Sequence, residues 1–328
     1  MKLVLRIVAG LFGLFILAII GGYVYLKTAL PNAGPVPQIT IASSSEQIER
    51  GKYLANHVAV CTDCHSKRDY SFFAGPLKPE TFGAGGEEFP ESMGFPGTLY
   101  ARNITPAGLK DWTDGEIFHA LTTGIRKNRE PIFPLMPWHR YATSDKEDIL
   151  SIIAYIKTLK PIENQVPETR LNFPLNLIVR TMPKAPAFVT RPDTTDEVAY
   201  GKYLANMAAC ADCHTMTKKG EPLPGMDFAG GFQFIMPQGV LRSANITPDE
   251  KTGIGTWTRE QFINRFKTYA QESAQRIPVV EPYTETQFQT VMPWIMYAGM
   301  TEKDLGSIYA YLRSVKAVDH PVKKFTVN

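Results

Sequence analysis

Every cysteine of this chain lies in a five-residue motif that ends in histidine. The two motifs, "CTDCH" (61–65) and "CADCH" (210–214), contain Cys61, Cys64 and His65 and Cys210, Cys213 and His214. Cysteines at this spacing lie about one helical turn apart, so both thiols can reach one edge of a porphyrin and form thioethers with its vinyl groups. The adjacent imidazole then stands over the ring and supplies a nitrogen ligand to the iron. The motifs therefore predict two covalently bound haem c groups, with the two histidines as iron ligands.

Other uses of the cysteines explain less of the pattern. A disulfide between Cys61 and Cys64 can form in an oxidising compartment, but it gives no role to the histidine. A single four-cysteine zinc site usually joins two C-x-x-C units over about 15–20 residues. Here Cys64 and Cys210 are 146 positions apart. Two matches at equivalent places of a repeated sequence also argue against chance.

The motifs sit inside a longer sequence duplication. Four segments recur in the same order: "GKYLAN" at 51–56 and 201–206, "NITP" at 103–106 and 245–248, "WT" at 112–113 and 257–258, and "MPW" at 136–138 and 292–294. Conserved order over this length indicates a duplicated domain rather than scattered similarity. The main length difference is an insertion in the second copy, within residues 265–290.

The duplication also suggests the sixth iron ligands. Met136 and Met292 recur in register in the "MPW" segments, after the haem motif of each copy. A methionine thioether is a soft ligand that favours ferrous iron, so histidine and methionine together raise a haem's reduction potential. Among the other histidines, His139 is the alternative ligand, because it lies three residues beyond Met136.

The N-terminus reads as a membrane segment. After Lys2 and Arg6, residues 7–26 are uncharged and mostly apolar. Twenty residues in a helix span about 30 Å, the thickness of a bilayer's hydrocarbon core. A cleaved signal peptide usually has a shorter apolar region and a small-residue cleavage site, which makes a retained anchor the better interpretation. Positive charge before the segment places the N-terminus in the cytoplasm and the rest of the chain outside it.

These patterns divide the chain into five parts: an anchor (1–30), a tether (31–45), a first half (46–160), a proline-rich linker (161–192) and a second half (193–328). The linker is expected to be extended, neither helix nor inner strand, and to lie against a domain surface. Within the halves, capping-box patterns predict helices beginning at Ser144 and after Thr194. A third helix is expected within residues 112–125, and Gly/Pro-rich loops separate the helices.

With these motifs in place, the sequence resembles class I cytochrome c domains in tandem. It is most similar to the cytochrome c subunits of membrane-bound alcohol and gluconate dehydrogenases. The resemblance rests on "CADCHT", on "AGG" at 84–86 and 229–231, on "NITPDEKTGIGTWT" at 245–258, on "MPW" before the final helix, and on the linker "LNFPLNLIVR" at 171–180. Those subunits usually carry three haem motifs and a C-terminal anchor, whereas this chain has two motifs and an N-terminal anchor.

The resemblance implies a mainly α, all-helical fold: two tandem domains with long loops around covalent haems, preceded by one transmembrane helix. In each domain the first and last helices cross, and Gly51 and Gly201 allow close approach of the aromatic Tyr155 and Tyr311. The "NITP" loops and two indoles are candidates for surrounding the haem propionates, which nominates Asn103, Asn245, Trp112 and Trp257. For the two tryptophans, an ordinary position in the core is the alternative.

Together these features predict an electron-transfer protein, not an enzyme: a dihaem c-type cytochrome of a bacterial inner membrane with its haem domains in the periplasm. Its partners would be redox proteins, in a respiratory, dehydrogenase or photosynthetic complex. The alternatives are a dihaem peroxidase, a haem-based sensor, or a free shuttle swinging on residues 31–45. A formal net charge of +3 and the lack of a Lys/Arg-rich run argue against a nucleic-acid partner.

Overall fold

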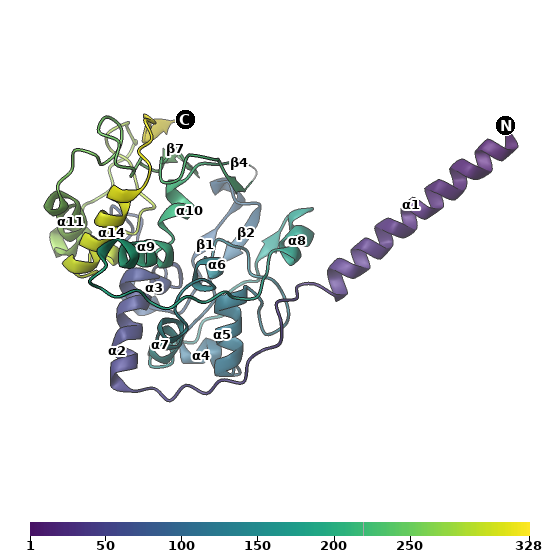
Figure 1. Ribbon diagram of the computed structural model, residues 1–328, viewed down its shortest axis with the longest axis horizontal. Coiled ribbons are helices and arrows are strands. Elements are labelled where there is room, and N and C mark those ends of the chain that lie inside the picture. The colour runs from purple at the N-terminus through teal and green to yellow at the C-terminus, as the bar shows by residue number, and fades with distance from the viewer. Residues whose placement is uncertain (219) are drawn as a thin grey trace.

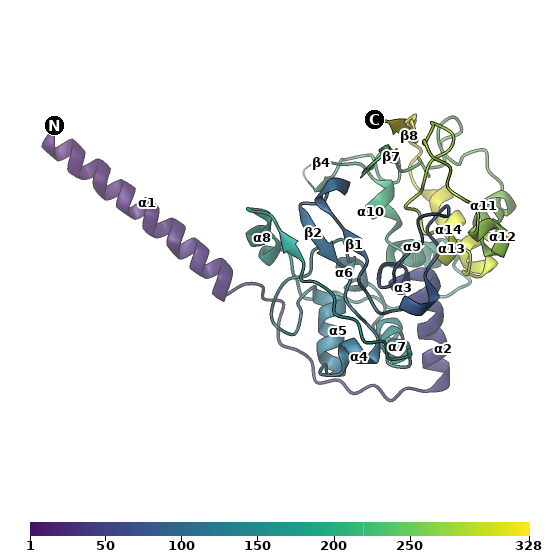
Figure 2. The same ribbon diagram turned by 180° about the vertical axis from the view of Figure 1, so that it is seen from behind.

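The computed structural model describes residues 1–218 and 220–328, and within them the chain is mainly helical. A long helix, α1 (Lys2–Thr28), projects away from a body formed by the rest of the chain (Figures 1 and 2). By length and composition α1 could cross a membrane, and none of its residues is buried. The helices of the body are α2 (Ser45–Tyr53), α3 (Cys61–Cys64), α4 (Pro106–Leu109), α5 (Asp114–Thr123), α6 (Trp138–Tyr141), α7 (Lys146–Ile156), α8 (Leu175–Ile178), α9 (Glu197–Met207), α10 (Cys210–His214), α11 (Arg259–Lys267), α12 (Glu272–Gln275), α13 (Trp294–Tyr297) and α14 (Glu302–Ser314).

The expectation of an all-helical fold is wrong in detail, because the segments between the helices contain short β-strands. Two three-stranded antiparallel sheets form, in the orders β1-β2-β3 and β6-β7-β8, together with the hairpin β4-β5. The strands are β1 (Glu88–Phe89), β2 (Gly97–Tyr100), β3 (Arg170–Leu171), β4 (Thr217–Lys218), β5 (Glu221–Pro222), β6 (Gln233–Met236), β7 (Gly239–Arg242) and β8 (Phe325–Val327).

In each half, the first and last helices cross at a glycine, as the resemblance implied. Helix α2 packs on α7, and α9 packs on α14. A Cβ on Gly51 would lie 1.7 Å from the Ser151 carbonyl oxygen, and one on Gly201 would lie 1.8 Å from that of Ser307. The glycines therefore bring two helix backbones into contact. The atoms nearest to both glycines are these backbone atoms rather than the rings of Tyr155 and Tyr311.

The first half has one more residue than the second between the glycine of "GKYLAN" and the first cysteine of its motif. Residues Leu54–Val58 form a π-helical turn, closed by a 2.7 Å bond from the Ala59 N–H to the Leu54 carbonyl. A single π-turn accommodates one inserted residue without breaking a helix, and such turns are frequent at functional sites. In the second half, α9 continues without it to Met207.

The helix starts differ slightly from those predicted. Asp145, and not Ser144, caps α7, because its carboxylate accepts the Glu147 N–H while the Ser144 hydroxyl bonds back to Arg140. Asp196, and not Thr194, caps α9 by accepting the Ala199 N–H. The third expected helix forms as α5, with a complete capping box at its N-terminus.

The tether and the linker both lie along the first half. In the tether, the Ile41 N–H donates to Asp114 over 2.8 Å, and Ile39 and Ile41 pack against the core. In the linker, the Ala187 N–H donates to the Ala142 carbonyl over 2.8 Å. The predicted contact of the linker with a domain surface is confirmed, but the prediction that it contains no helix is wrong, because it forms α8.

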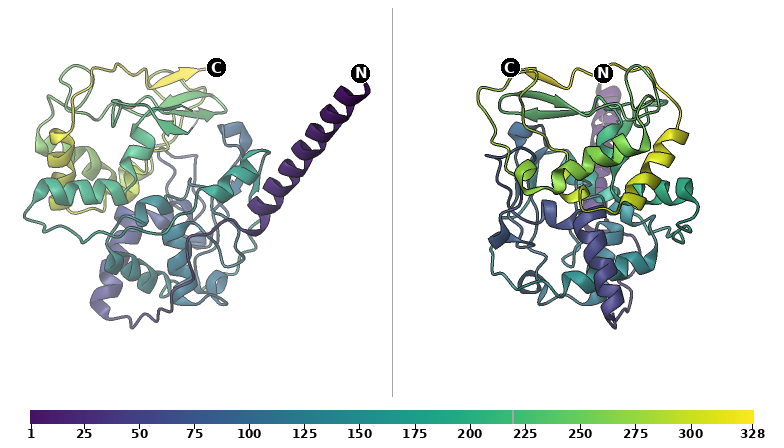
Figure 3. Two further views of the ribbon diagram at one scale, coloured as in Figure 1. Left: turned by 45° about the vertical axis from the view of Figure 1, so that its right-hand side comes forward. Right: turned by 90° about the vertical axis from the view of Figure 1, so that its left-hand side faces the viewer.

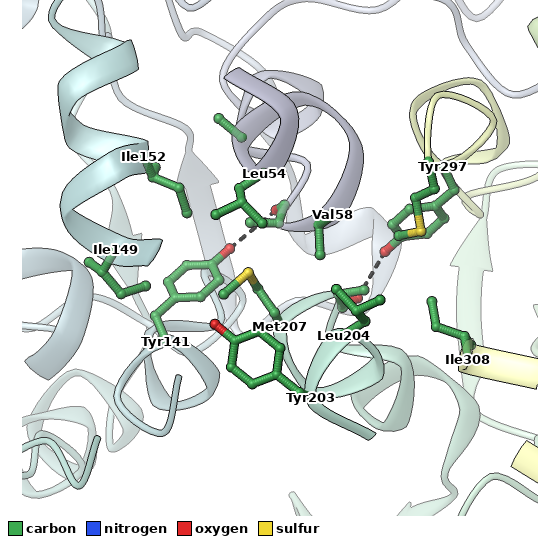
Figure 4. Packing of buried hydrophobic residues seen from close by; sticks show 14 of the residues in the cluster. Leu54, Val58, Tyr141, Ile149, Ile152, Tyr203, Leu204, Met207, Tyr297 and Ile308 are labelled. Carbon is green, nitrogen blue, oxygen red and sulfur yellow. Dashed lines mark hydrogen bonds between the residues drawn. The ribbon is translucent and has the colours of Figure 1, made fainter. Parts of the chain in front are cut away.

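The two halves share one continuous apolar core, built largely from the crossing helices. Figure 3 shows the fold of both halves from two further sides. Figure 4 shows residues of both halves meeting there, with Leu54 and Val58 from the first half facing Leu204 and Met207 from the second. Part of the inserted segment of the second half also crosses over: the buried side chain of Gln289 accepts from the Ala74 N–H and donates to the Tyr70 and Phe72 carbonyls.

Candidate haem sites

Each C-x-x-C-H motif begins directly after a residue in the left-handed backbone region. Val60 has a φ of 44° and Ala209 a φ of 53°. Residues other than glycine rarely adopt this conformation, and for β-branched valine it is a clear outlier. The strained turn occurs in both halves at the same place, immediately before the first cysteine. It redirects the chain from the preceding helix into α3 or α10, and so sets the direction of the motif.

Both motif histidines are held by a backbone carbonyl. The Nδ1 atom of His65 lies 2.6 Å from the Arg102 carbonyl oxygen, and that of His214 lies 2.8 Å from the Ala244 oxygen. A carbonyl can only accept, so Nδ1 carries the proton in each ring. This tautomer leaves the Nε2 lone pair available for a metal, which is how iron and zinc histidines are usually oriented.

Burial also favours the metal-binding form of each imidazole, because it disfavours the protonated ring. It lowers the pKa of both His65 and His214, partly offset by their bonds to the two carbonyls. The imidazoles therefore stay neutral, as metal ligands must be. Burial also raises the pKa of all four cysteine thiols to about 12.

The "NITP" and "AGG" segments flank these carbonyl acceptors and hold them in place. Arg102 and Ala244 directly precede the two "NITP" sequences. Gly85 and Gly230 pack against them, where a Cβ would lie 2.4 Å from the carbonyl carbon of Arg102 or Ala244. Both glycines have a positive φ near 70° and donate their N–H to the carbonyl of the motif histidine over 2.8 Å. Sequence reasoning found these segments, which recur in the same order in both copies, but missed this role.

Asn103 and Asn245 organise the same loops. The side-chain oxygen of Asn103 accepts from the N–H and hydroxyl of Thr105, and that of Asn245 accepts from the same groups of Thr247. Their amide groups donate to the Ile162 and Val318 carbonyls, each over 2.8 Å. Asn245 also donates to Thr252, so both of its amide hydrogens are used within the chain. Their clearest role is to shape the loops.

The two methionines are placed alike. Met136 and Met292 are half-buried and pack against the shared core. In each case the backbone N–H of the tryptophan two residues later donates to the methionine carbonyl over 2.8 Å. This bond closes the same turn before α6 and before α13. Trp112 and Trp257, with Cys61 and Cys210, border this core as well.

A tyrosine in the helix after each methionine ties it to the turn before the cysteines. The Tyr141 hydroxyl donates to the Ala59 carbonyl over 3.2 Å, and the Tyr297 hydroxyl donates to the Ala208 carbonyl over 2.8 Å. Both bonds are drawn in Figure 4. The segment with the methionine and the segment with the cysteines and histidine are therefore fastened together in each half.

The structure does not support a disulfide or a zinc site at these residues. All four cysteines are free thiols, so the alternative disulfide is not formed. Within residues 1–218 and 220–328, no three His, Cys, Asp or Glu side chains converge as a zinc site would require. His139, the alternative ligand, directs Nε2 toward the Asp212 carboxylate at 3.2 Å.

These features fit a covalent haem at each motif. The chain offers two thiols one turn apart, an imidazole with a free Nε2, and a thioether-bearing segment fastened to the same turn. The first cysteine of each motif and both methionines pack against the shared apolar core. The donor set of nitrogen and sulfur atoms is also the one expected for a low-spin cytochrome c iron.

Comparison with known proteins agrees with this chemistry. Residues 198–316 match the cytochrome c family model. The chain is 28% identical over 305 residues to the fructose dehydrogenase cytochrome subunit of Gluconobacter japonicus, covering 87% of this chain and 56% of that protein. It is also 28% identical over 251 residues to an alcohol dehydrogenase (quinone) cytochrome c subunit of Gluconacetobacter polyoxogenes, covering 72% and 51%.

A third relative is closer in length. The chain is 25% identical over 273 residues to a diheme cytochrome c-type protein of Cereibacter sphaeroides, covering 79% of this chain and 83% of that protein. By contrast, the chain spans about half the length of the two dehydrogenase subunits. These matches confirm the predicted resemblance: residues 198–316 are similar to the cytochrome c family, and the chain is similar to cytochrome c subunits of dehydrogenases.

Proposed function

We propose that this chain is a membrane-anchored dihaem c-type cytochrome that passes single electrons between a donor and an acceptor. The observation that carries the proposal is the matched pair of histidine contacts, His65 to Arg102 and His214 to Ala244. Each leaves one Nε2 free beside one pair of cysteines. A family match covers the second half, and the equivalent contacts in the first half support a second haem there.

In this proposal Cys61, Cys64, Cys210 and Cys213 hold the haems, His65 and His214 are the proximal ligands, and Met136 and Met292 complete the coordination. The haem iron supplies the one-electron redox chemistry. The chain orients each imidazole through a carbonyl, keeps it neutral and covers the site with apolar side chains. Trp112 and Trp257 remain the proposed neighbours of the propionates.

The similarity to dehydrogenase subunits suggests the kind of complex. The relatives are named as cytochrome subunits of fructose and alcohol dehydrogenases, and we extend the electron-accepting role of such a subunit to this chain. Helix α1 would anchor it in a bacterial inner membrane, with the haem-bearing body in the periplasm. A tether packed along the first half favours a fixed subunit over the freely swinging shuttle.

Redox titration with a ligand challenge tests the proposal on the full chain purified from its native membranes. Two one-electron transitions are expected, and each ferric haem should show methionine charge-transfer absorption and resist cyanide. A dihaem peroxidase needs one open coordination position with acid/base groups beside it, so rapid cyanide binding at one haem would favour that alternative. Mass spectrometry of co-purifying proteins then identifies the donor complex.

A further inference from the structure

A buried arginine of the linker has no part in the haem sites. Arg180 is 5% exposed and lies in a short 3₁₀ turn, Val179–Thr181, just after α8. Its Nε donates to the Leu26 and Leu30 carbonyls over 2.8 and 3.0 Å. Its Nη2 donates to Leu30 over 2.7 Å, and its Nη1 pairs with Glu130 of the first half over 2.9 Å.

These acceptors lie at the end of the apolar helix. The last carbonyls of a helix have no partner within it and carry partial negative charge, so a guanidinium is a well-suited donor there. Through Arg180 the C-terminal end of α1 is bound to the linker and, by way of Glu130, to the first half. The body is thereby held in one orientation relative to α1.

The segment next to this clamp exposes apolar side chains. Phe173 is 79% exposed and Ile178 is 46% exposed, and between them lie the half-buried Leu175 and Leu177. Figures 1 and 2 show α8 on the side of the body that faces α1, close to its C-terminal end. An exposed phenylalanine beside a membrane helix calls for an apolar or interfacial environment.

Aromatic residues near the C-terminal end of α1 lie at the same height along the helix as α8. Tyr23 and Tyr25 lie in its last turns, half or more exposed, followed by Lys27. Tyrosine near the end of a membrane-spanning helix sits at the headgroup layer, and lysine there extends toward water. The Arg180 clamp binds residues 26–30, so it holds α8 at this level.

We propose that residues 173–178 are a second membrane contact, in which Phe173 and Ile178 enter the headgroup layer of the leaflet from which α1 emerges. The inference rests on the proposed membrane anchoring. The occupant is the lipid bilayer, because the clamp fixes this surface beside α1. The contact would hold both haem sites at a constant height and tilt above the membrane.

The test uses the full haem-loaded chain in phosphatidylglycerol and phosphatidylethanolamine vesicles. In the haem-loaded chain all four native cysteines are thioethers, so a nitroxide label on Phe173→Cys attaches at one place. Val198→Cys is the matched control, since Val198 is 44% exposed and apolar but lies on α9, away from α1. Relaxation by oxygen, which enters lipid, is compared with relaxation by a water-soluble nickel chelate.

The label at position 173 should show a several-fold higher ratio of oxygen to chelate accessibility than the label at 198, and Arg180→Gln should lower it. Equal ratios at the two positions would overturn the proposal. So would a label shielded in native membranes but open to the chelate in vesicles, because a protein partner would then cover the surface. Haem content and retention after carbonate washing are read on the same sample, so a failed anchor or missing haem is recognised separately.

Discussion

The Tyr53 hydroxyl donates a 2.5 Å hydrogen bond to the Asp304 carboxylate, across the boundary between the two halves. Tyr203 donates an equivalent 2.6 Å bond to Asp148 in the opposite direction. Both tyrosines follow the helix-crossing glycine by two residues, and both aspartates lie in the helix after the methionine loop. Duplicated residues therefore pair by exchange, as in a twofold interface, although both partners belong to one chain.

Removing these hydroxyls should destabilise the interface unequally. In Tyr53→Phe the buried Asp304 loses the one side-chain bond that the described residues give its carboxylate, which should cost about 1.5–3 kcal/mol. In Tyr203→Phe, Asp148 keeps Arg50 and Arg191, so the loss should be nearer about 1 kcal/mol. Urea unfolding of the haem-loaded variants measures both. No loss in either variant would show that the exchange pairs do not hold the halves together, and equal losses would show that Arg50 and Arg191 do not compensate for the lost Tyr203 bond.

The duplication predicted what each half repeats. It located the motifs and the methionine segments, because these depend on local spacing that recurs in both copies, whereas the crossing of the first and last helices was implied by the family resemblance. It did not predict the contacts between the copies, since no periodicity within a copy records which surface faces the other. The available signal was the recurrence of a tyrosine, Tyr53 and Tyr203, at the same place in both copies of "GKYLAN".

Helix boundaries that depend on competition between local hydrogen bonds were also not predicted. Asp145 rather than Ser144 caps α7 because the serine hydroxyl is already used by Arg140. Helix α8 is compatible with a proline-rich linker because it is only four residues long and its neighbouring proline, Pro174, lies at its N-cap. A proline at the start of a helix removes no hydrogen bond within it. The carbonyls that orient His65 and His214 were missed because backbone acceptors carry no residue-type signal.

The glycine crossings should not tolerate a side chain. Gly51→Ala and Gly201→Ala place a methyl group within 2 Å of a helix carbonyl, so each helix pair must separate, at a cost of about 1–3 kcal/mol. Thermal unfolding followed by haem absorbance measures the effect. Lys52→Ala and Lys202→Ala, exposed neighbours on the same helices, are the controls and should change stability by less than about 0.5 kcal/mol. Alanine variants as stable as these controls would contradict the close crossing.

Acid should weaken the interface through Asp148. Desolvation tends to raise the pKa of this carboxyl, but hydrogen bonds and charge from Arg50, with Tyr203 and Arg191, hold it below its usual 3.8. Because the pKa of Asp148 is lower in the folded than in the unfolded state, its contribution to the free energy of unfolding is fully present above about pH 4. That contribution is lost as the pH falls through the folded-state pKa of Asp148.

Comparison with Asp148→Asn isolates this group. The difference in unfolding free energy between wild type and variant should be largest near pH 7 and shrink below about pH 4, because the protonated carboxyl resembles the amide. Denaturant titrations at several pH values give the difference directly. A gap that stays constant, or widens in acid, would rule out Asp148 as the titrating group.

Methionine ligation should be separable between the two sites. Met136→Leu and Met292→Leu should each abolish the methionine charge-transfer absorption of one haem and lower the potential of that haem alone. The fall should be a sizeable part of the roughly 0.8 V that axial ligands span. Met300→Leu, a buried methionine outside the "MPW" segments, is the control and should leave both potentials unchanged. A wild-type first haem without this absorption, with a potential that Met136→Leu leaves unchanged, would instead favour His139 as its ligand.

Intact mass spectrometry of the full chain from native membranes tests the two-haem assignment most directly. The account predicts the polypeptide mass plus two haems, falling by one haem in the double variant Cys61→Ala/Cys64→Ala and by the other in Cys210→Ala/Cys213→Ala. A chain carrying one haem, on the second half alone, would contradict the central claim that both motifs are haem sites.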